Sequence, residues 1–165
     1  MYIRRFNLED ENGDSVFLWG ARQTGKTTWL VSQFPNCRYY DLLRPAEFER
    51  LLRHPELLSE ELEDFGPEDT VVIDEIQKLP QLLDEVHYLI QRKGIRFILS
   101  GSSARKLKRL GTNLLGGRAA KEQMYPLVSG EIPDFDLDRA INNGMIPRHY
   151  MVQTANYRLR GSLGG

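Results

Sequence analysis

The sequence predicts an α/β fold in which helices flank a parallel β-sheet. Two observations carry this prediction: short, largely apolar runs suit strands buried on both faces, and segments with helical patterns separate these runs along the chain. The 165 residues are 41% apolar and 27% charged, which is ordinary for one globular domain with a sizeable core. We expect right-handed crossovers between the parallel strands.

Four segments are predicted as strands because apolar and aromatic residues gather there between turn residues. They are residues 16–19, 38–42, 71–75 and 95–99. Pro35-Asn36 stands before the second strand, Gly66-Pro67 before the third and Gly94 before the fourth.

Helices are predicted to connect these strands. They cover about residues 25–34, 45–53, 55–64, 79–93 and 104–110. The clearest pattern is an apolar stripe with i, i+3, i+4 spacing, typical of a helix packed on a sheet, formed by Leu79, Leu82, Leu83, Val86, Leu89 and Ile90.

Residues 20–27 follow the first predicted strand and read Gly-Ala-Arg-Gln-Thr-Gly-Lys-Thr, the full pattern G-x-x-x-x-G-K-S/T of a phosphate-binding loop. Gly20 and Gly25 let the backbone bend around a polyphosphate with its N–H groups pointing inward. Lys26 is expected to reach the β- and γ-phosphates, and the Thr27 hydroxyl to coordinate Mg²⁺. A glycine-rich turn before an ordinary helix is the alternative. The residues predicted to bind the nucleotide are Gly20, Ala21, Arg22, Gln23, Thr24, Gly25, Lys26, Thr27 and Thr28.

Two adjacent carboxylates, Asp74 and Glu75, end the third predicted strand. Ligands of open α/β sheets bind at the carboxyl ends of the strands, so we expect this pair to lie near Lys26. Asp74 is predicted to hold the Mg²⁺. Glu75 is predicted to orient or deprotonate the water that attacks the γ-phosphate, which favours hydrolysis over binding alone.

A serine-rich turn follows the fourth predicted strand and shares that edge. Ser102 or Ser103 is expected to hydrogen-bond the attacking water or the γ-phosphate; the alternative is that one of them caps the following helix. Arg118 is a candidate arginine finger toward a neighbouring subunit, with Arg105 as a rival. An exposed arginine without a function is the alternative for both.

The net charge of −1 gives no global signal for nucleic acid or for a membrane surface. Charge is nevertheless unevenly distributed, because residues 86–121 carry nine basic and no acidic residues, and acidic residues crowd residues 56–69. Such blocks are usually solvated faces. A polyphosphate-facing surface, an acidic neighbouring subunit and DNA remain alternatives.

Cys37 is the single cysteine, so no internal disulfide is expected, and the three histidines have no metal-ligand spacing. No apolar run approaches membrane-spanning length, and the N-terminal residues lack a signal-like apolar segment. A cytoplasmic protein is therefore expected.

Several linked segments closely resemble the AAA-like ATP-binding proteins of bacteria and archaea that carry a C-terminal domain of unknown function. The segments are residues 20–28 (GARQTGKTT), 40–42 (YDL), 71–80 (VVIDEIQKLP), 97–107 (FILSGSSARKL) and 114–119 (LLGGRA). The resemblance runs from about residue 10 to 150 and includes the stretch from Phe135 to Tyr150.

This resemblance implies a P-loop NTPase of the strand-inserted, AAA-like class, in which the strand ending at Ser100 lies between those ending at Gly20 and Glu75. It also implies ATP as the nucleotide, and it puts Ser102 and Ser103 in the sensor position. We expect an ATPase domain over residues 1–150 and a poorly ordered tail over residues 151–165, with the C-terminal domain absent.

Mg²⁺-dependent ATP hydrolysis is the leading functional hypothesis. A nucleotide-gated binding or regulatory module with little turnover is the alternative, and a small-molecule phosphotransferase is a weaker third. ATP and ADP are the expected ligands. An oligomer of identical chains is a possibility that the sequence does not decide. Neither a membrane nor a nucleic-acid partner is indicated, and the sequence identifies no protein partner.

Overall fold

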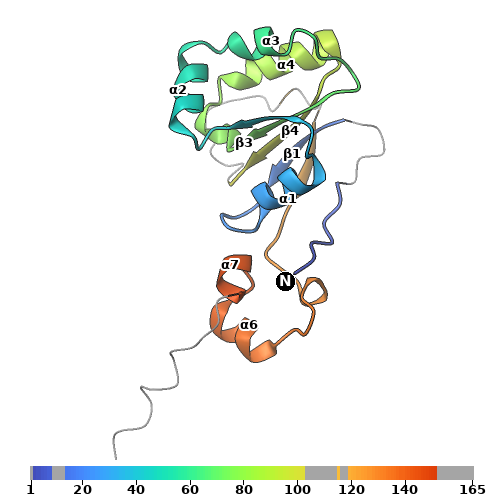
Figure 1. The fold of residues 1–165 in the computed structure, drawn as a ribbon, viewed down its shortest axis with the longest axis vertical. Helices are drawn as coiled ribbons and strands as arrows, with labels where there is room; N and C mark the ends of the chain where they lie inside the picture. The colour runs from blue at the N-terminus through green and yellow to red at the C-terminus, as the bar shows by residue number, and fades with distance from the viewer. Residues whose placement is uncertain (1, 9–13, 103–114, 116–118, 152–165) are drawn as a thin grey trace, which may run out of the picture. The chain divides into compact units, whose positions relative to one another are not determined.

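The computed structural model describes residues 2–8, 14–102, 115 and 119–151 (Figure 1). It divides into two compact units. The sheet unit comprises Phe6–Tyr125, and the C-terminal unit comprises Met1–Arg5 together with Pro126–Gly165. This division falls inside the predicted domain of residues 1–150, whose end at residue 150 stays a prediction.

The sheet unit is built on five parallel strands in the order β2-β3-β4-β1-β5. The strands are β1 (Ser15–Trp19), β2 (Arg38–Asp41), β3 (Thr70–Asp74), β4 (Arg96–Gly101) and β5 (Ala119–Gln123). Because β4 pairs with both β1 and β3, the strand-inserted order expected from the resemblance is confirmed. All carboxyl ends therefore meet at one edge of the sheet.

Helices cover both faces of this sheet, with α1 on one face and α2, α3 and α4 on the other (Figure 1). The helical segments of the sheet unit are α1 (Lys26–Gln33), α2 (Pro45–Arg53), α3 (Leu57–Glu61), the 3-10 turn η1 (Ile76–Lys78) and α4 (Leu82–Lys93). Side chains alternate between two cores: Phe17 and Phe97 pack in the cluster with α4, and Leu18 and Ile98 pack against α1.

Most element ends differ from the sequence-based expectation by one or two residues, and three elements differ more. The helix predicted from residue 79 begins at Leu82, because the chain first makes the turn η1 and then passes Pro80. The helix predicted over residues 55–64 is shorter, from Leu57 to Glu61. Strand β5 was not predicted, because an edge strand with one buried residue, Ala119, carries almost no apolar signal. The helix predicted over residues 104–110 lies outside the described residues.

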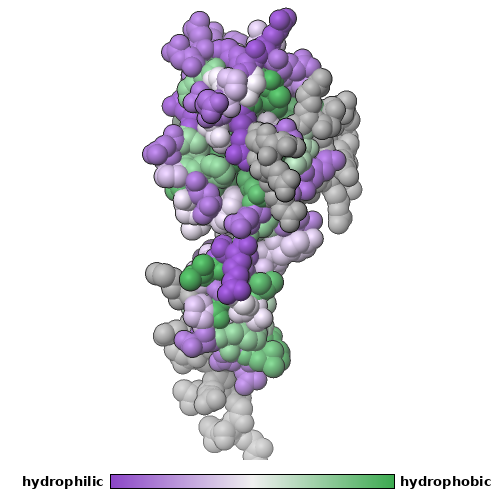
Figure 2. Space-filling view, turned by 90° about the vertical axis from the view of Figure 1, so that its right-hand side faces the viewer, coloured by the Kyte–Doolittle hydropathy of each residue, from purple (hydrophilic) through white to green (hydrophobic). Residues whose placement is uncertain are grey.

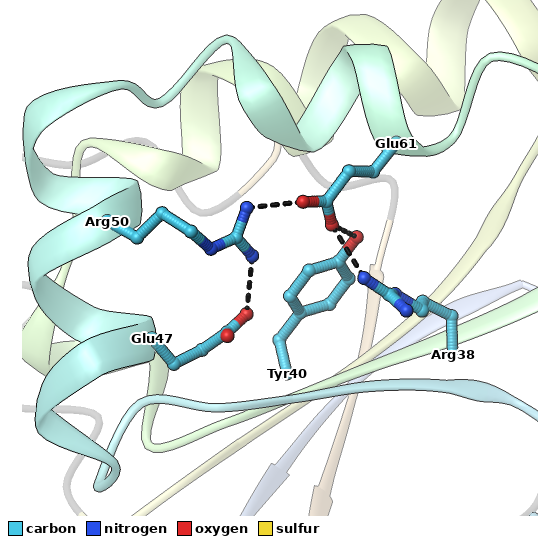
Figure 3. Close-up of polar contacts among 5 residues, drawn as sticks. All are labelled: Arg38, Tyr40, Glu47, Arg50 and Glu61. Carbon is cyan, nitrogen blue, oxygen red and sulfur yellow. Dashed lines mark hydrogen bonds and ion pairs between the residues drawn. The ribbon is translucent and has the colours of Figure 1, made fainter.

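A charged cluster ties strand β2 to helices α2 and α3 (Figure 3). Arg38 Nη2 lies 2.8 Å and the Tyr40 hydroxyl 2.9 Å from Glu61 Oε2, and Arg50 pairs with the other oxygen of Glu61. Arg50 also pairs with Glu47 at 2.8 Å. Glu61 belongs to the acidic block of the sequence, so its partners come from β2 and α2 instead of the basic residues that follow it.

The C-terminal unit contains η3 (Ser129–Glu131), α6 (Leu137–Asn143) and α7 (Pro147–Tyr150), none of which was predicted. Its core is small, with Leu127, Ile132 and Tyr150 as the buried apolar residues. The buried Glu131 forms a 3.0 Å ion pair with Arg4. Apolar surface is visible on this unit in Figure 2, and its exposed large apolar side chains are Ile3, Val128, Phe135, Leu137, Ile141 and Met151.

Among the described residues, no helix is both long enough and apolar enough to span a membrane.

Candidate functional site

The loop between β1 and α1 lies at the carboxyl edge of the sheet, seated between the ends of β4 and β5. Gly20 N–H donates to the Gly101 carbonyl at 3.2 Å, and a Cβ added to Gly20 would lie 2.4 Å from the Met124 carbonyl oxygen. Gly25 has a φ of 90°, which favours glycine, and Gln23 also has a positive φ of 66°. Gly25 is thus required by backbone conformation, and Gly20 by close packing against the end of β5.

The first turn of α1 contains no acidic residue, and no side chain caps its N-terminus. The backbone N–H groups at this end of a helix carry partial positive charge and need acceptors. Thr24 is fully buried, and its hydroxyl donates to the Ala21 carbonyl at 2.9 Å, which braces the loop from within. This combination of loop and helix start suits a bound phosphate group.

Lys26 folds back over this loop. Its Nζ donates to the carbonyl oxygens of Gly20 at 2.7 Å and Ala21 at 3.0 Å, and only 6% of the residue is exposed. Burial lowers the pKa of Lys26, while the negative charges of Glu75 and Asp74 oppose that shift. A buried ammonium group at the loop is positioned to attract a polyphosphate.

Asp74 ends β3 and is 1% exposed, yet it accepts hydrogen bonds from three hydroxyl groups. Thr27 Oγ1 lies 2.7 Å and the Tyr39 hydroxyl 2.8 Å from its Oδ2, and the Ser100 hydroxyl bonds its Oδ1. These three donors satisfy the hydrogen-bonding capacity of the buried carboxyl oxygens. Burial is the main cause that raises the pKa of Tyr39, followed by the charge and hydrogen bond of Asp74, which keeps Tyr39 a donor.

Thr27 and Asp74 are the two residues predicted to bind Mg²⁺, and their side chains are in direct contact. In the described part of the chain no three His, Cys, Asp or Glu side chains form a metal cluster. Mg²⁺ bound with a nucleotide does not need one, since phosphate oxygens and water supply most of its ligands. One carboxylate and one hydroxyl oxygen therefore fit this metal.

Glu75 follows Asp74 in a left-handed backbone conformation, with a φ of 61° that is rare for a residue other than glycine. Its Oε2 accepts hydrogen bonds from the Gln77 amide and, at 3.3 Å, from the Ser102 hydroxyl. The Gln77 amide also donates to Ser102 Oγ at 3.1 Å. The two residues predicted to act on the water and the γ-phosphate, Glu75 and Ser102, are therefore neighbours.

The sequence-based prediction missed three residues of this site, Tyr39, Ser100 and Gln77. Tyr39 reaches Asp74 from the neighbouring strand β2, and Ser100 does so from β4. Ser100 directly follows the predicted strand 95–99, and this place is its only sequence signal. Tyr39 is the second residue of the predicted strand 38–42 and carries no such signal. Gln77 lies two residues beyond Glu75, and nothing in the local pattern marks it.

Ala21, Arg22 and Gln23 are exposed in the loop, and Thr28 is exposed on α1. Ser103, Arg105 and Arg118 lie outside the described residues. The sensor role of Ser103 and the finger role of either arginine therefore stay predictions.

A family model described as an AAA domain matches residues 12–132, which is more than half of the chain and includes the loop, the Asp74-Glu75 pair and the serine turn. No curated protein matches the chain.

Proposed function

Because the chain belongs to the AAA domain family, we propose that it binds ATP with Mg²⁺ and hydrolyses it to ADP and phosphate. Membership of the family, together with the five-stranded parallel sheet, makes it a nucleotide-binding module of the ATPase type. Hydrolysis, the metal and the role of each residue are our proposals.

In this proposal the loop N–H groups and Lys26 hold the β- and γ-phosphates. Thr27 and Asp74 hold the Mg²⁺, which neutralises charge that develops on the phosphates. Glu75 accepts a proton from the attacking water, and Ser102 donates a hydrogen bond to the γ-phosphate or to that water.

One observation carries the proposal: the 2.7 Å hydrogen bond from Thr27 to Asp74. It joins the phosphate-binding loop to the acidic strand end across 47 positions of sequence. A loop that were only a glycine-rich turn before a helix would not need a buried carboxylate beside its Lys-Thr pair. The contact supports a shared metal and phosphate site.

The test is phosphate release from Mg·ATP by the parent chain and by Glu75→Gln. The variant keeps the size and hydrogen-bonding capacity of the side chain but cannot accept the proton, so turnover should fall by about a hundredfold or more with ATP affinity retained. Glu68→Gln is the matched control, since Glu68 is exposed and precedes β3, whereas the site lies at the other, carboxyl end of that strand. Equal turnover in the parent and Glu75→Gln would reject hydrolysis through Glu75.

A nucleotide-gated binding module is the second candidate. It is favoured by one observation, that Glu75 Oε2 already accepts two hydrogen bonds from the chain itself. In that case the parent chain would bind ATP in calorimetry but release no more phosphate than Lys26→Ala. An EDTA control in the same titration tests whether Mg²⁺ is part of the complex.

A further inference from the structure

Gln77 occupies an unusual place for an amide side chain. It lies in η1, is 5% exposed, and sits between Glu75, Ser102 and the Gly101 backbone. Its Nε2 donates to Glu75 Oε2 and to Ser102 Oγ. Because a carboxylate accepts and never donates, the nitrogen end of this amide must be the one that faces Glu75.

The other end of the amide, Gln77 Oε1, is buried and has no hydrogen-bond partner among the described residues. It packs beside Gly101, where an added Cβ would lie 2.3 Å from Oε1 and 2.6 Å from the Trp19 ring. The absence of a side chain at Gly101 thus makes room for Gln77. A buried acceptor without a donor destabilises the folded chain.

An apolar side chain of the same length would avoid this cost. Methionine has nearly the volume of glutamine, is unbranched, and carries no strong hydrogen-bonding group. Gln77 is therefore a poor choice for stability alone, and such local conflicts are typical of functional sites. What glutamine offers here, and methionine does not, is a nitrogen with two hydrogens, one for Glu75 and one for Ser102.

We propose that Gln77 is a positioning residue that holds the Glu75 carboxylate and the Ser102 hydroxyl in a fixed mutual arrangement. Through this arrangement, a γ-phosphate that binds Ser102 changes the hydrogen bonds of Glu75. The proposal rests on the proposed hydrolysis. Ser102 has a single proton, which it donates to Glu75 Oε2 at 3.3 Å. A γ-phosphate oxygen competes with Glu75 as the acceptor of this hydrogen bond. When Ser102 donates to the phosphate, Glu75 Oε2 can accept a hydrogen bond from water instead.

Gln77 stays bonded to Glu75 through this exchange, which keeps the carboxylate from turning away as Ser102 leaves it. A glutamate side chain has three rotatable bonds, and a displacement of about 1 Å from its productive place can reduce a rate by about a hundredfold. Gln77 thus acts on turnover through Glu75 and Ser102, without itself touching the nucleotide.

The test compares Gln77→Met with the parent chain and with Gln91→Met, a matched exchange at an exposed position of α4. Three quantities are measured: ATP affinity by calorimetry, turnover by phosphate release, and the free energy of unfolding by urea. For Gln77→Met we expect affinity within about twofold, turnover lower by about tenfold to a hundredfold, and a stability that is unchanged or higher. A residue kept for structure alone would give lower stability with turnover retained.

A double-mutant cycle separates positioning from any independent effect. If Gln77 acts through Glu75, adding Gln77→Met to Glu75→Gln should lower turnover no further. Gln77→Leu is measured beside it, so that a packing defect peculiar to methionine is recognised.

Parent-like turnover in both Gln77 variants, with folding intact, would overturn the proposal, as would a full second loss in the Glu75→Gln background. A parent chain that releases no more phosphate than Lys26→Ala would instead reject the proposed hydrolysis, and the role of Gln77 with it.

Discussion

The Thr27 hydroxyl donates to the Asp74 carboxylate at 2.7 Å, so the two side chains proposed to share Mg²⁺ are already in contact without it. A metal ion in this place would take the hydroxyl oxygen as a ligand, and the Thr27 proton would turn to another acceptor. Asp74 would not need to move far, because Tyr39 and Ser100 also hold its oxygens. The site is preorganised by hydroxyl groups from three different elements.

Lys26→Ala tests the phosphate-binding loop. The lysine Nζ donates hydrogen bonds to the carbonyl oxygens of Gly20 and Ala21. We propose that it donates to a bound polyphosphate instead when the nucleotide is present. Hydrogen bonds to charged groups contribute about 1.5–3 kcal/mol, so ATP affinity should fall by about tenfold to a hundredfold. Calorimetric titration measures it, with the exposed Lys121→Ala as control. Unchanged ATP affinity in Lys26→Ala would remove the central claim.

Tyr39→Phe tests whether the hydroxyl groups around Asp74 serve the metal. The variant removes one donor, 2.8 Å from Asp74 Oδ2, and keeps the ring. Loss of such a supporting contact typically weakens metal binding by about tenfold or more. The Mg²⁺ concentration that gives half-maximal ATP binding should rise accordingly, while ATP affinity in EDTA stays constant.

Tyr88→Phe is the control for that exchange, because Tyr88 lies on α4 and is 53% exposed. An identical Mg²⁺ titration for Tyr39→Phe and the parent chain would show that Tyr39 only packs beside the strand end.

The loop glycines and Lys26 were predicted from the local spacing of the phosphate-binding pattern, and Asp74 from its place at the end of an apolar strand; their roles stay predictions. Tyr39, Ser100 and Gln77 could not be predicted, because each reaches the site from another strand or turn and is of a common residue type. The register of the sheet decides their place, and that register depends on the whole core. Strand β5 was missed for a related reason: its pairing with β1 is made by the backbone, and its side chains are mostly polar.

Acid should weaken the cluster around Glu61. Burial alone raises the pKa of Glu61, but hydrogen bonds from Arg38, Tyr40 and Arg50 outweigh it and leave the pKa below its usual value of 4.5. The unfolded chain therefore binds a proton at a higher pH than the folded chain does. The contribution to stability is complete above pH 4.5 and is lost as the pH falls through the folded-state pKa.

Glu61→Gln should lower the free energy of unfolding by about 1 kcal/mol at neutral pH. The difference from the parent should shrink in an acidic buffer well below pH 4.5, as the parent glutamate takes up a proton. Urea unfolding at both pH values measures this, with Glu49→Gln as control because that side chain is 62% exposed. A difference that stays constant with pH would contradict a charged Glu61 as the source of the stability.

Gly20→Ala tests whether the conformation of the phosphate-binding loop depends on its packing against the end of strand β5. A methyl group at Gly20 would lie 2.4 Å from the Met124 carbonyl oxygen, a backbone atom that cannot turn aside as a side chain would. The segment is also fixed by the 2.7 Å hydrogen bond from Met124 N–H to the Trp19 carbonyl, so either the loop or the end of β5 must shift. We expect the free energy of unfolding to fall by about 1–3 kcal/mol. ATP binding should also weaken, because the loop N–H groups move with Gly20.

Gly66→Ala is the matched control, since a Cβ there meets nothing within 4 Å. Equal stability and equal ATP affinity in the two alanine variants would show that the end of β5 yields freely and that the loop does not depend on it.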